Sequence, residues 1–356
     1  MHYSLAELKD IPVFFIVGKG RSGTTLLSTI IDSHPNVASA TESRFLLLIW
    51  QKYKRMRVWD ADNTTQFIKD VNRDILVGYL WEFSEGFAEN IASLPKEATI
   101  QDLIKLVYIY RKSNFEHKGR IKFIVDKNPK YTIFVDKLIS IFPEAKFFRL
   151  IRDPRDNVTS QINYSKNPVG LIANKWLNYN EKLDRFAKKH PNQFKTQRFE
   201  DLILNKEEFF EKFGEYSNIK NLASYEKERL KIKDKFEEKF SDRLKTQHQA
   251  TVKPLNPKKI GHHKQKLSEE QIKIIDSYCF PYAENWGYVR EQPAQSLTLV
   301  TKVRAQINYT LLDFAHKFYY SLPFSVMLGS RNFILNNFQP NKKEKLLEVI
   351  SSNEKK

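Results

Sequence analysis

Short apolar runs recur along the first 200 residues of the chain, separated by longer segments with apolar residues at helical spacing. Four of these runs read as buried strands, because each is short and ends near a glycine or a charged residue; they are "IPVFFIVG", "RIKFIVD", "AKFFRLI" and a run within "NQFKTQRFEDLI". The first run leads through a glycine loop into "TTLLSTIIDSH", which reads as a helix. Strands that alternate with helices predict an α/β fold with a central parallel sheet flanked by helices.

The pattern changes toward the C-terminus. Residues 225–240 are highly charged and predict an exposed helix, and Ser268 with Gln271 forms a capping-box pattern before another helix. The alternation of strands and helices is complete near residue 290. We therefore predict one α/β domain over residues 10–290 and a helical C-terminal extension over residues 291–356.

The predicted extension contains "AQINYTLLDFAHKFYYSL", whose large apolar residues share one helical face: Ile307, Leu311, Phe314 and Phe318. Lysine and arginine are scattered around this face. The pattern is compatible with a cap over a cleft, a dimer contact or a peripheral membrane contact, and it does not choose among them.

Composition narrows the class of partner. The chain has 356 residues and a net charge of +17, which favours an anionic partner, although the same charge also serves solubility. Cys279 is the only cysteine, so no intrachain disulfide is expected. No apolar run reaches the roughly 18 to 20 residues that span a bilayer, and "MHYSLAELKD" does not resemble a signal peptide. We expect a cytoplasmic protein without a transmembrane segment.

The glycine loop "GKGRSGTTLL" carries the first chemical signal. Gly18 and Gly23 have the spacing of a nucleotide-triphosphate loop, but Thr24 stands where that loop has its lysine. No second acidic strand for magnesium is evident, which disfavours triphosphate hydrolysis. What remains is a set of backbone N–H groups at a helix N-terminus, which suits a small anion bound without a metal. The polar side chains available there are Arg21, Ser22, Thr24 and Thr25.

A second motif, "FFRLIRDPRDNVTSQ", follows the third predicted strand. Arg152 ends the strand, and Ser160 lies eight residues later in the following helix. A guanidinium fork together with a hydroxyl is suited to binding a terminal phosphate. A charged turn would explain "RDPRD" alone, but two motifs in matching strand–loop–helix contexts favour a nucleotide site.

The two motifs together resemble those of the sulfotransferases that use 3′-phosphoadenosine 5′-phosphosulfate (PAPS). The resemblance implies a P-loop NTPase-like sulfotransferase fold and PAPS as the donor, with no metal. It implies a 5′-phosphosulfate loop made of Gly20, Arg21, Ser22, Gly23, Thr24 and Thr25, and a 3′-phosphate site made of Arg152 and Ser160. "KPLNPKKIGHHKQKLS" resembles the family's C-terminal cofactor lid, with His262 and Lys264 as nucleotide contacts. His262 replaces the usual basic residue, and Phe199 replaces a frequent tyrosine.

The resemblance also supplies catalytic candidates. "SHPNVASATESR" matches the "HP…E-x-R" element of the tyrosylprotein sulfotransferase-like branch, which implies that Glu42 is the base and that Arg44 is its partner or an acceptor-site residue. "VDKNPK" implies that Lys127, with Arg21 of the loop, stabilises the transferring group. His34 is the second candidate for the base or an acceptor-site residue, although its place before a proline favours a structural role. Without the resemblance, a helix-terminal carboxylate and a solvated lysine would be the simpler interpretations.

The expected activity is transfer of a sulfuryl group to an acceptor hydroxyl. A small-molecule alcohol such as a sterol, lipid or sugar ranks above a protein tyrosine, because the chain lacks the leader and disulfides of secretory enzymes. A small-molecule or nucleotide kinase is an alternative, which a magnesium requirement would reveal. A nucleic-acid-binding protein is another, which would bind polynucleotides in a strongly salt-dependent way. We see no nucleic-acid motif and expect no such partner.

Overall fold

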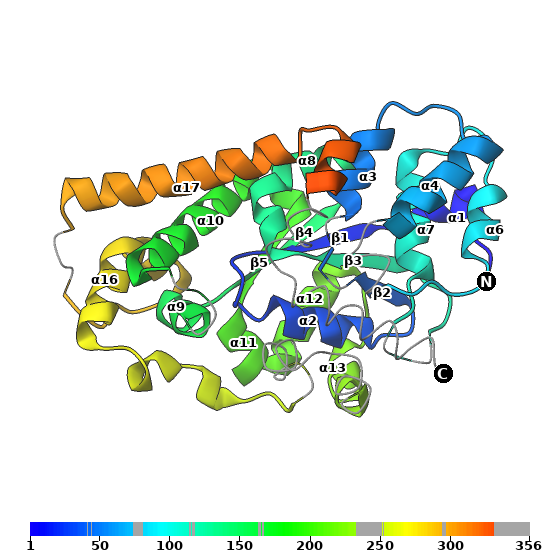
Figure 1. The fold of residues 1–356 in the computed structure, drawn as a ribbon. Helices are drawn as coiled ribbons and strands as arrows, with labels where there is room; N and C mark the ends of the chain where they lie inside the picture. The colour runs from blue at the N-terminus through cyan, green and yellow to red at the C-terminus, as the bar shows by residue number, and fades with distance from the viewer. Residues whose placement is uncertain are drawn as a thin grey trace, which may run out of the picture.

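A computed structural model describes residues 1–40, 42–43, 45–73, 81–113, 115, 118–162, 165, 167–232, 251, 253–293 and 297–330. Its centre is a parallel sheet of five strands in the order β2-β3-β1-β4-β5 (Figure 1). The strands are β1 Val13–Val17, β2 Val37–Ala40, β3 Phe123–Lys127, β4 Lys146–Ile151 and β5 Phe194–Arg198. The predicted α/β class is confirmed, and four of the five strands are the predicted ones.

Strand β2 was not predicted from the sequence. Its four residues, "VASA", include two alanines and a serine, and such a short run of small residues carries little strand signal. Its position explains its stability, because it pairs with β3 and is buried along its whole length. It also brings the chain back to the carboxyl edge of the sheet, directly before Glu42.

Both faces of the sheet are buried, as expected for a parallel sheet covered by helices. Phe15 and Val17 of β1 point into one apolar cluster, whereas Phe14 and Ile16 point into the other. The first cluster includes residues of α1 Leu5–Asp10, α3 Phe45–Tyr53, α4 Ala61–Arg73, α6 Phe87–Ala92, α7 Ile100–Tyr110, α8 Val135–Ile141 and α10 Val169–Lys189. The second includes residues of α2 Thr24–Asp32, α11 Phe199–Leu204, α12 Lys206–Ser217 and α13 Leu222–Tyr225.

Loops and short helices connect these layers at the carboxyl edge of the sheet. The helix α9 Pro154–Ile162 follows β4, and a 3₁₀ helix, η1 Pro129–Phe134, follows β3. Other 3₁₀ helices are η2 Pro191–Gln193, η3 Glu228–Ile232, η5 Pro257–Lys259, η6 His262–Gln265 and η7 Tyr282–Trp286. Only the first part of the charged segment 225–240 can be compared with its predicted helix, where the structure has the end of α13 and η3; residues 233–240 lie outside the described residues.

The helices α16 Glu269–Cys279 and α17 Leu299–Tyr319 lie toward the C-terminus, and a short helical segment over residues 324–330 follows them. The helix α16 begins with the predicted capping box, in which Ser268 and Gln271 each accept a hydrogen bond from the other's backbone N–H. The helix α17 lies along α10, away from the sheet (Figure 1). Asn174 of α10 donates to the carbonyl oxygen of Ala305 at 3.1 Å. The division of the chain at residue 290 stays a prediction.

Among the helices that the structure describes, none is both long and apolar enough to cross a membrane.

Candidate functional site

The glycine loop between β1 and α2 is a tight cradle. Gly18 and Gly23 have φ angles of 133° and 86°, which favour glycine. A Cβ atom on Gly18 would lie 2.9 Å from the carbonyl oxygen of Leu150, and one on Gly23 would lie 2.3 Å from Phe199. Both glycines are therefore required by conformation and by close packing, as the sequence pattern indicates.

The loop presents the N-terminus of α2 as an anion site. Gly23 is the N-cap residue, and no side chain caps the first N–H groups of the helix. These N–H groups and the positive end of the helix dipole therefore suit a bound anion. Asn157 of α9 fixes the loop by donating to the carbonyl oxygen of Gly20 and to the hydroxyl of Ser22, both at 3.0 Å. Asn157 was not among the predicted residues, although it lies inside the quoted "RDPRDN" motif.

Arg21, Arg152 and Ser160 come together beside this loop, as predicted. Nε of Arg21 donates to Oγ of Ser160 at 3.1 Å, and Arg152 donates to the backbone carbonyl of Arg21 at 3.2 Å. Arg152 also donates to the carbonyl of Lys259 at 2.7 Å. The motif after β1, the motif after β4 and the C-terminal loop thus meet at one guanidinium.

Phe199 replaces the hydroxyl that a tyrosine would bring with an apolar ring. The ring lies against Gly23, and the guanidinium carbon of Arg152 lies 4.5 Å from the ring centre. Such a cation–π contact orients the guanidinium without a hydrogen bond. Phe199 therefore supports both halves of the site through packing.

Lys127 links the glycine loop to Glu42. It ends β3 and is only 3% exposed. Its Nζ donates to Oγ1 of Thr25 at 3.1 Å and lies 2.6 Å from Oε1 of Glu42. The Glu42 side chain is 48% exposed, so one end of this ion pair is buried and the other is open. The predicted catalytic pair is therefore assembled at the carboxyl edge of the sheet, where parallel α/β folds bind ligands.

The segment that carries Lys127 is held from behind. Asn128 donates to the carbonyl oxygen of Ser43 at 2.8 Å, which ties the β3 loop to the residue next to Glu42. Asp126 receives a hydrogen bond from the Tyr108 hydroxyl at 2.5 Å. Burial raises the pKa of Asp126 to about 7, although hydrogen bonds from Tyr108 and Tyr131 oppose the rise.

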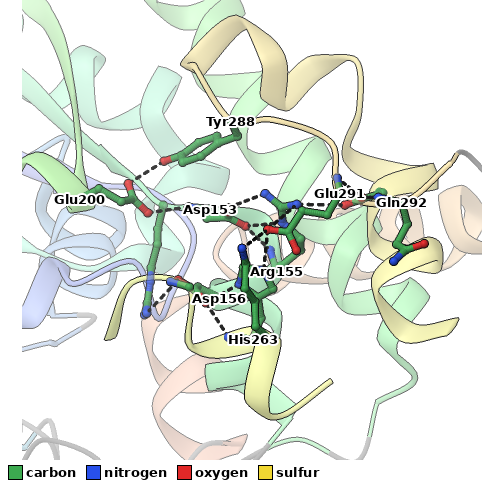
Figure 2. Close-up of polar contacts among 12 residues, drawn as sticks. Asp153, Arg155, Asp156, Glu200, His263, Tyr288, Glu291 and Gln292 are labelled. Atoms are coloured by element: carbon green, nitrogen blue, oxygen red, sulfur yellow. Dashed lines mark hydrogen bonds and ion pairs between the residues drawn. The ribbon is translucent and has the colours of Figure 1, made fainter. Parts of the chain in front are cut away.

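The C-terminal loop is fastened to the start of α9 by Asp156, as Figure 2 shows. The backbone N–H groups of Gly261 and His263 donate to its carboxylate at 2.8 and 2.9 Å. Nδ1 of His263 lies 2.7 Å from the same carboxylate, and Nε2 lies 3.1 Å from Glu291. These contacts hold the loop residue Lys259 over Arg152.

A second set of contacts in Figure 2 supports the same corner. Arg155 donates to both oxygens of Asp153, at 3.0 and 2.7 Å, and lies 3.3 Å from Glu291. Glu200 accepts from the Asp153 backbone at 3.1 Å and from the Tyr288 hydroxyl at 2.9 Å. The turn after β4 is therefore fixed from three separate segments.

The two neighbouring histidines of the C-terminal loop differ in burial and in partners. His263, not His262, is the buried member with carboxylate partners. His262 is partly exposed, and burial together with the charge of Lys259 lowers its pKa. Lys264 is exposed and lies 3.5 Å from Glu291. The roles of His262 and Lys264 as nucleotide contacts stay predictions.

His34 is not brought to this site. It directly precedes β2, at the amino edge of the parallel sheet, whereas the glycine loop, Glu42 and Lys127 follow their strands at the carboxyl edge. Nδ1 of His34 accepts from the backbone of Asn36 at 3.1 Å, and its ring packs on Tyr225. These contacts agree with the structural role expected for a histidine before proline. Arg44 lies outside the described residues.

Lys19 is a buried cation that sequence reasoning missed. It is 3% exposed and donates to Oε1 of Gln161. Burial, with the charges of Lys175 and Arg21, lowers its pKa to about 7. Its position between Gly18 and Gly20 of the loop is the sequence feature that could have identified it.

Within the described ranges, no group of three or more histidine, cysteine, aspartate or glutamate residues could hold a metal ion.

A model of the Sulfotransferase family matches residues 12–220. The chain belongs to this family. The match includes the glycine loop, Glu42, Lys127, Arg152 and Ser160, and it ends before the C-terminal loop.

The chain is also similar to curated protein-tyrosine sulfotransferases. Protein-tyrosine sulfotransferase 1 of Danio rerio is 23% identical over 218 residues, which cover 59% of this chain and 54% of the relative. Protein-tyrosine sulfotransferase 1 of Homo sapiens is 24% identical over 173 residues, which cover 49% of this chain and 40% of the relative. The chain spans about half the length of the curated relatives it matches.

Solved structures were also compared. The sulfotransferase domain from the Synechococcus PCC 7002 olefin synthase has a TM-score of 0.49 and 16% identity, covering 79% of this chain and 96% of that chain. Retinol dehydratase in complex with androsterone and inactive cofactor PAP has a TM-score of 0.32 and 13% identity, covering 79% and 82%.

Proposed function

We propose that the protein transfers a sulfuryl group from PAPS to an acceptor hydroxyl. The observation that carries this proposal is Lys127, whose buried ammonium contacts the glycine loop at Thr25 and the half-exposed carboxylate of Glu42. This places a cation between an anion-binding loop and a candidate base. Transfer of an anionic group to a hydroxyl needs a cation that offsets the charge of the transferred group and a base that takes the hydroxyl proton.

The residues present fit the nucleotide. Among the described residues, the buried Nε of Arg152 has no hydrogen-bond partner, so the guanidinium retains a donor. The α2 N-terminus lacks a side-chain cap, so its first N–H groups are available to an anion. Arg152 and Ser160 would hold the 3′-phosphate, while Arg21, Ser22, Thr24 and Thr25 would hold the 5′-phosphosulfate.

The chain's own groups then have distinct tasks. The bound donor supplies a sulfuryl group, whose bond to the phosphate oxygen breaks as its bond to the acceptor oxygen forms. Glu42 accepts the hydroxyl proton on one carboxylate oxygen. Lys127 and Arg21 offset the negative charge that develops on the sulfuryl oxygens and on the leaving phosphate. The buried position of Lys127 strengthens this effect, because less water screens its charge.

The proposal also ranks the possible acceptors. We rank a small-molecule alcohol such as a sterol, lipid or sugar first, and a protein tyrosine second. The names of the relatives favour the tyrosine, at 20–24% identity. Sequence similarity at this level supports a shared reaction more strongly than a shared acceptor.

The test of the donor is calorimetric titration with the product nucleotide, 3′-phosphoadenosine 5′-phosphate, in the presence of a chelator. We expect micromolar binding by the wild type, loss of binding in Arg152→Ala, and no binding of ATP. Tighter binding of ATP with magnesium would contradict the proposal and favour a kinase.

The acceptor is then identified with labelled PAPS. A panel of hydroxyl compounds and tyrosine-containing peptides is incubated with the wild type and with Glu42→Gln. Labelling that depends on Glu42 and appears only on peptides would reverse our ranking of acceptors while leaving the reaction class intact.

A further inference from the structure

The outer side of α17 carries a continuous apolar stripe. The side facing the body includes Ala305, which is buried, and Tyr309, which packs on Tyr179 of α10. The opposite side exposes six large apolar side chains, each between 45% and 76% exposed: Val300, Val303, Ile307, Leu311, Phe314 and Phe318. Figure 1 shows that the described elements lie on the inner side of this helix. A contiguous exposed patch of this kind marks an interaction surface.

The stripe runs along one side of the helix. Its members follow one another at steps of three, four, four, three and four residues. The steps add up to five turns of an α-helix with 3.6 residues per turn, so the stripe runs straight for about 27 Å. A straight stripe can contact a plane along its whole length.

The charges beside the stripe have one predominant sign. Arg304 and Lys317 flank the stripe and are exposed, whereas Lys302 is exposed on the side of the helix that carries Ala305 and Tyr309. The helix has one acidic residue, Asp313, which is turned partly inward and lies 2.6 Å from Lys317. An apolar face bordered by basic residues matches helices that lie in the interface of an anionic bilayer. The net charge of +17 adds a long-range attraction to the same surface.

We propose that α17 docks the protein on an anionic lipid surface, with the helix axis parallel to the membrane plane. The apolar stripe enters the boundary between headgroups and acyl chains, and the basic residues beside it contact lipid phosphates. The proposal is independent of the proposed reaction, because it depends only on the outer face of α17. An apolar contact between two copies of the chain is the competing occupant.

The test is sedimentation of the full-length protein with phosphatidylcholine vesicles, with and without phosphatidylserine. Wild type should bind the anionic vesicles, and high salt should weaken the binding. Ile307→Ser/Phe314→Ser should reduce the affinity at least about tenfold, because two exposed side chains no longer enter the bilayer. Arg304→Glu should weaken the preference for phosphatidylserine.

Leu204→Ser is the matched control. Leu204 is 59% exposed but lies on α11, so its substitution should leave vesicle binding unchanged. Circular dichroism verifies that each variant is folded. Absence of wild-type binding, or equal binding by wild type and the stripe variant, would overturn the proposal. A dimer that binds no vesicles and that the stripe variant separates would assign the face to a second copy.

Discussion

The Lys127 side chain is fixed by contacts with two residues of the proposed active site. Its ammonium contacts Thr25 beside the glycine loop and the half-exposed carboxylate of Glu42. Because the side chain is buried, it has little freedom to move away from either partner. Its burial and its two contacts distinguish Lys127 from a solvated loop lysine, which the sequence alone could not do.

Substitutions of Lys127 and Glu42 should lower the rate of the chemical step. Lys127→Ala should lower kcat by about 10²–10³-fold, the usual cost of removing one group that stabilises developing charge. Glu42→Gln should lower it by about 10²–10⁴-fold, since the base is lost. Steady-state rates with labelled PAPS measure both effects. Glu97→Gln, at an exposed position far along the sequence, is the control. A Glu42→Gln variant with the wild-type rate would remove Glu42 as the base.

Substitution of Gly23 tests the packing between the glycine loop and Phe199. In Gly23→Ala, the new Cβ would meet the Phe199 ring at 2.3 Å, and the backbone would retain its φ of 86°. Overpacking and left-handed strain together should cost about 2–4 kcal/mol of unfolding free energy. Gly261→Ala is the matched control, since its φ is 70° but nothing lies within 4 Å of the added Cβ. We expect it to cost about 1 kcal/mol. Urea denaturation compares the two, and equal losses would contradict the role of Phe199.

At the scale of the elements, the C-terminal loop is held against the start of α9. Asp156 in the first turn of α9 receives two backbone N–H groups and the His263 ring from this loop. Burial lowers the pKa of His263, but hydrogen bonding to Asp156 and the nearby carboxylates outweigh it and raise the pKa above 6.5. Protonated His263 therefore stabilises the closed loop.

The sign of the pH dependence follows from this raised pKa. The contribution of His263 to stability is fully present below pH 6.5 and is lost as the pH rises through its folded-state pKa. Wild type should therefore lose stability relative to His263→Gln as the pH rises above 6.5. Thermal melts of both proteins across this range measure the difference.

His262→Gln is the control with the opposite sign. The pKa of His262 is lowered by burial and by Lys259, so protonation of this ring opposes folding. Wild type should gain stability relative to His262→Gln as the pH rises toward and past 6.5. The same trend in both variants would show that His263 does not carry the proton.

The elements were predictable to the extent that their signals are local. The strand, glycine loop and helix around Gly23 lie within a single stretch, and Arg152 with Ser160 lies within another, so spacing alone located both. The role of Asp156 depends on a contact with His263 more than 100 residues away, which no local pattern encodes. His34 illustrates the same limit, because sequence proximity to Glu42 hides the strand that places them at opposite edges of the sheet.

At the scale of the whole molecule, the proposed nucleotide site joins three distant segments. The glycine loop, the start of α9 and the C-terminal loop meet at Arg152, which contacts the backbone of Arg21 and of Lys259. The C-terminal loop is in turn followed by α16 and α17, both of which pack on α10. We therefore expect a ligand bound at Arg152 to stabilise contacts between the α/β layers and the C-terminal helices.

This coupling predicts a thermal shift. The product nucleotide at about 100 times its Kd should stabilise the folded protein by about 2.7 kcal/mol. For a chain of 356 residues, this corresponds to a rise in Tm of about 3–4 °C. Arg152→Ala should show no rise, because the three segments lose their common contact. The stripe variant Ile307→Ser/Phe314→Ser should show the full rise, since its substitutions face away from the site. A rise of the same size in Arg152→Ala would place the nucleotide elsewhere on this basic protein.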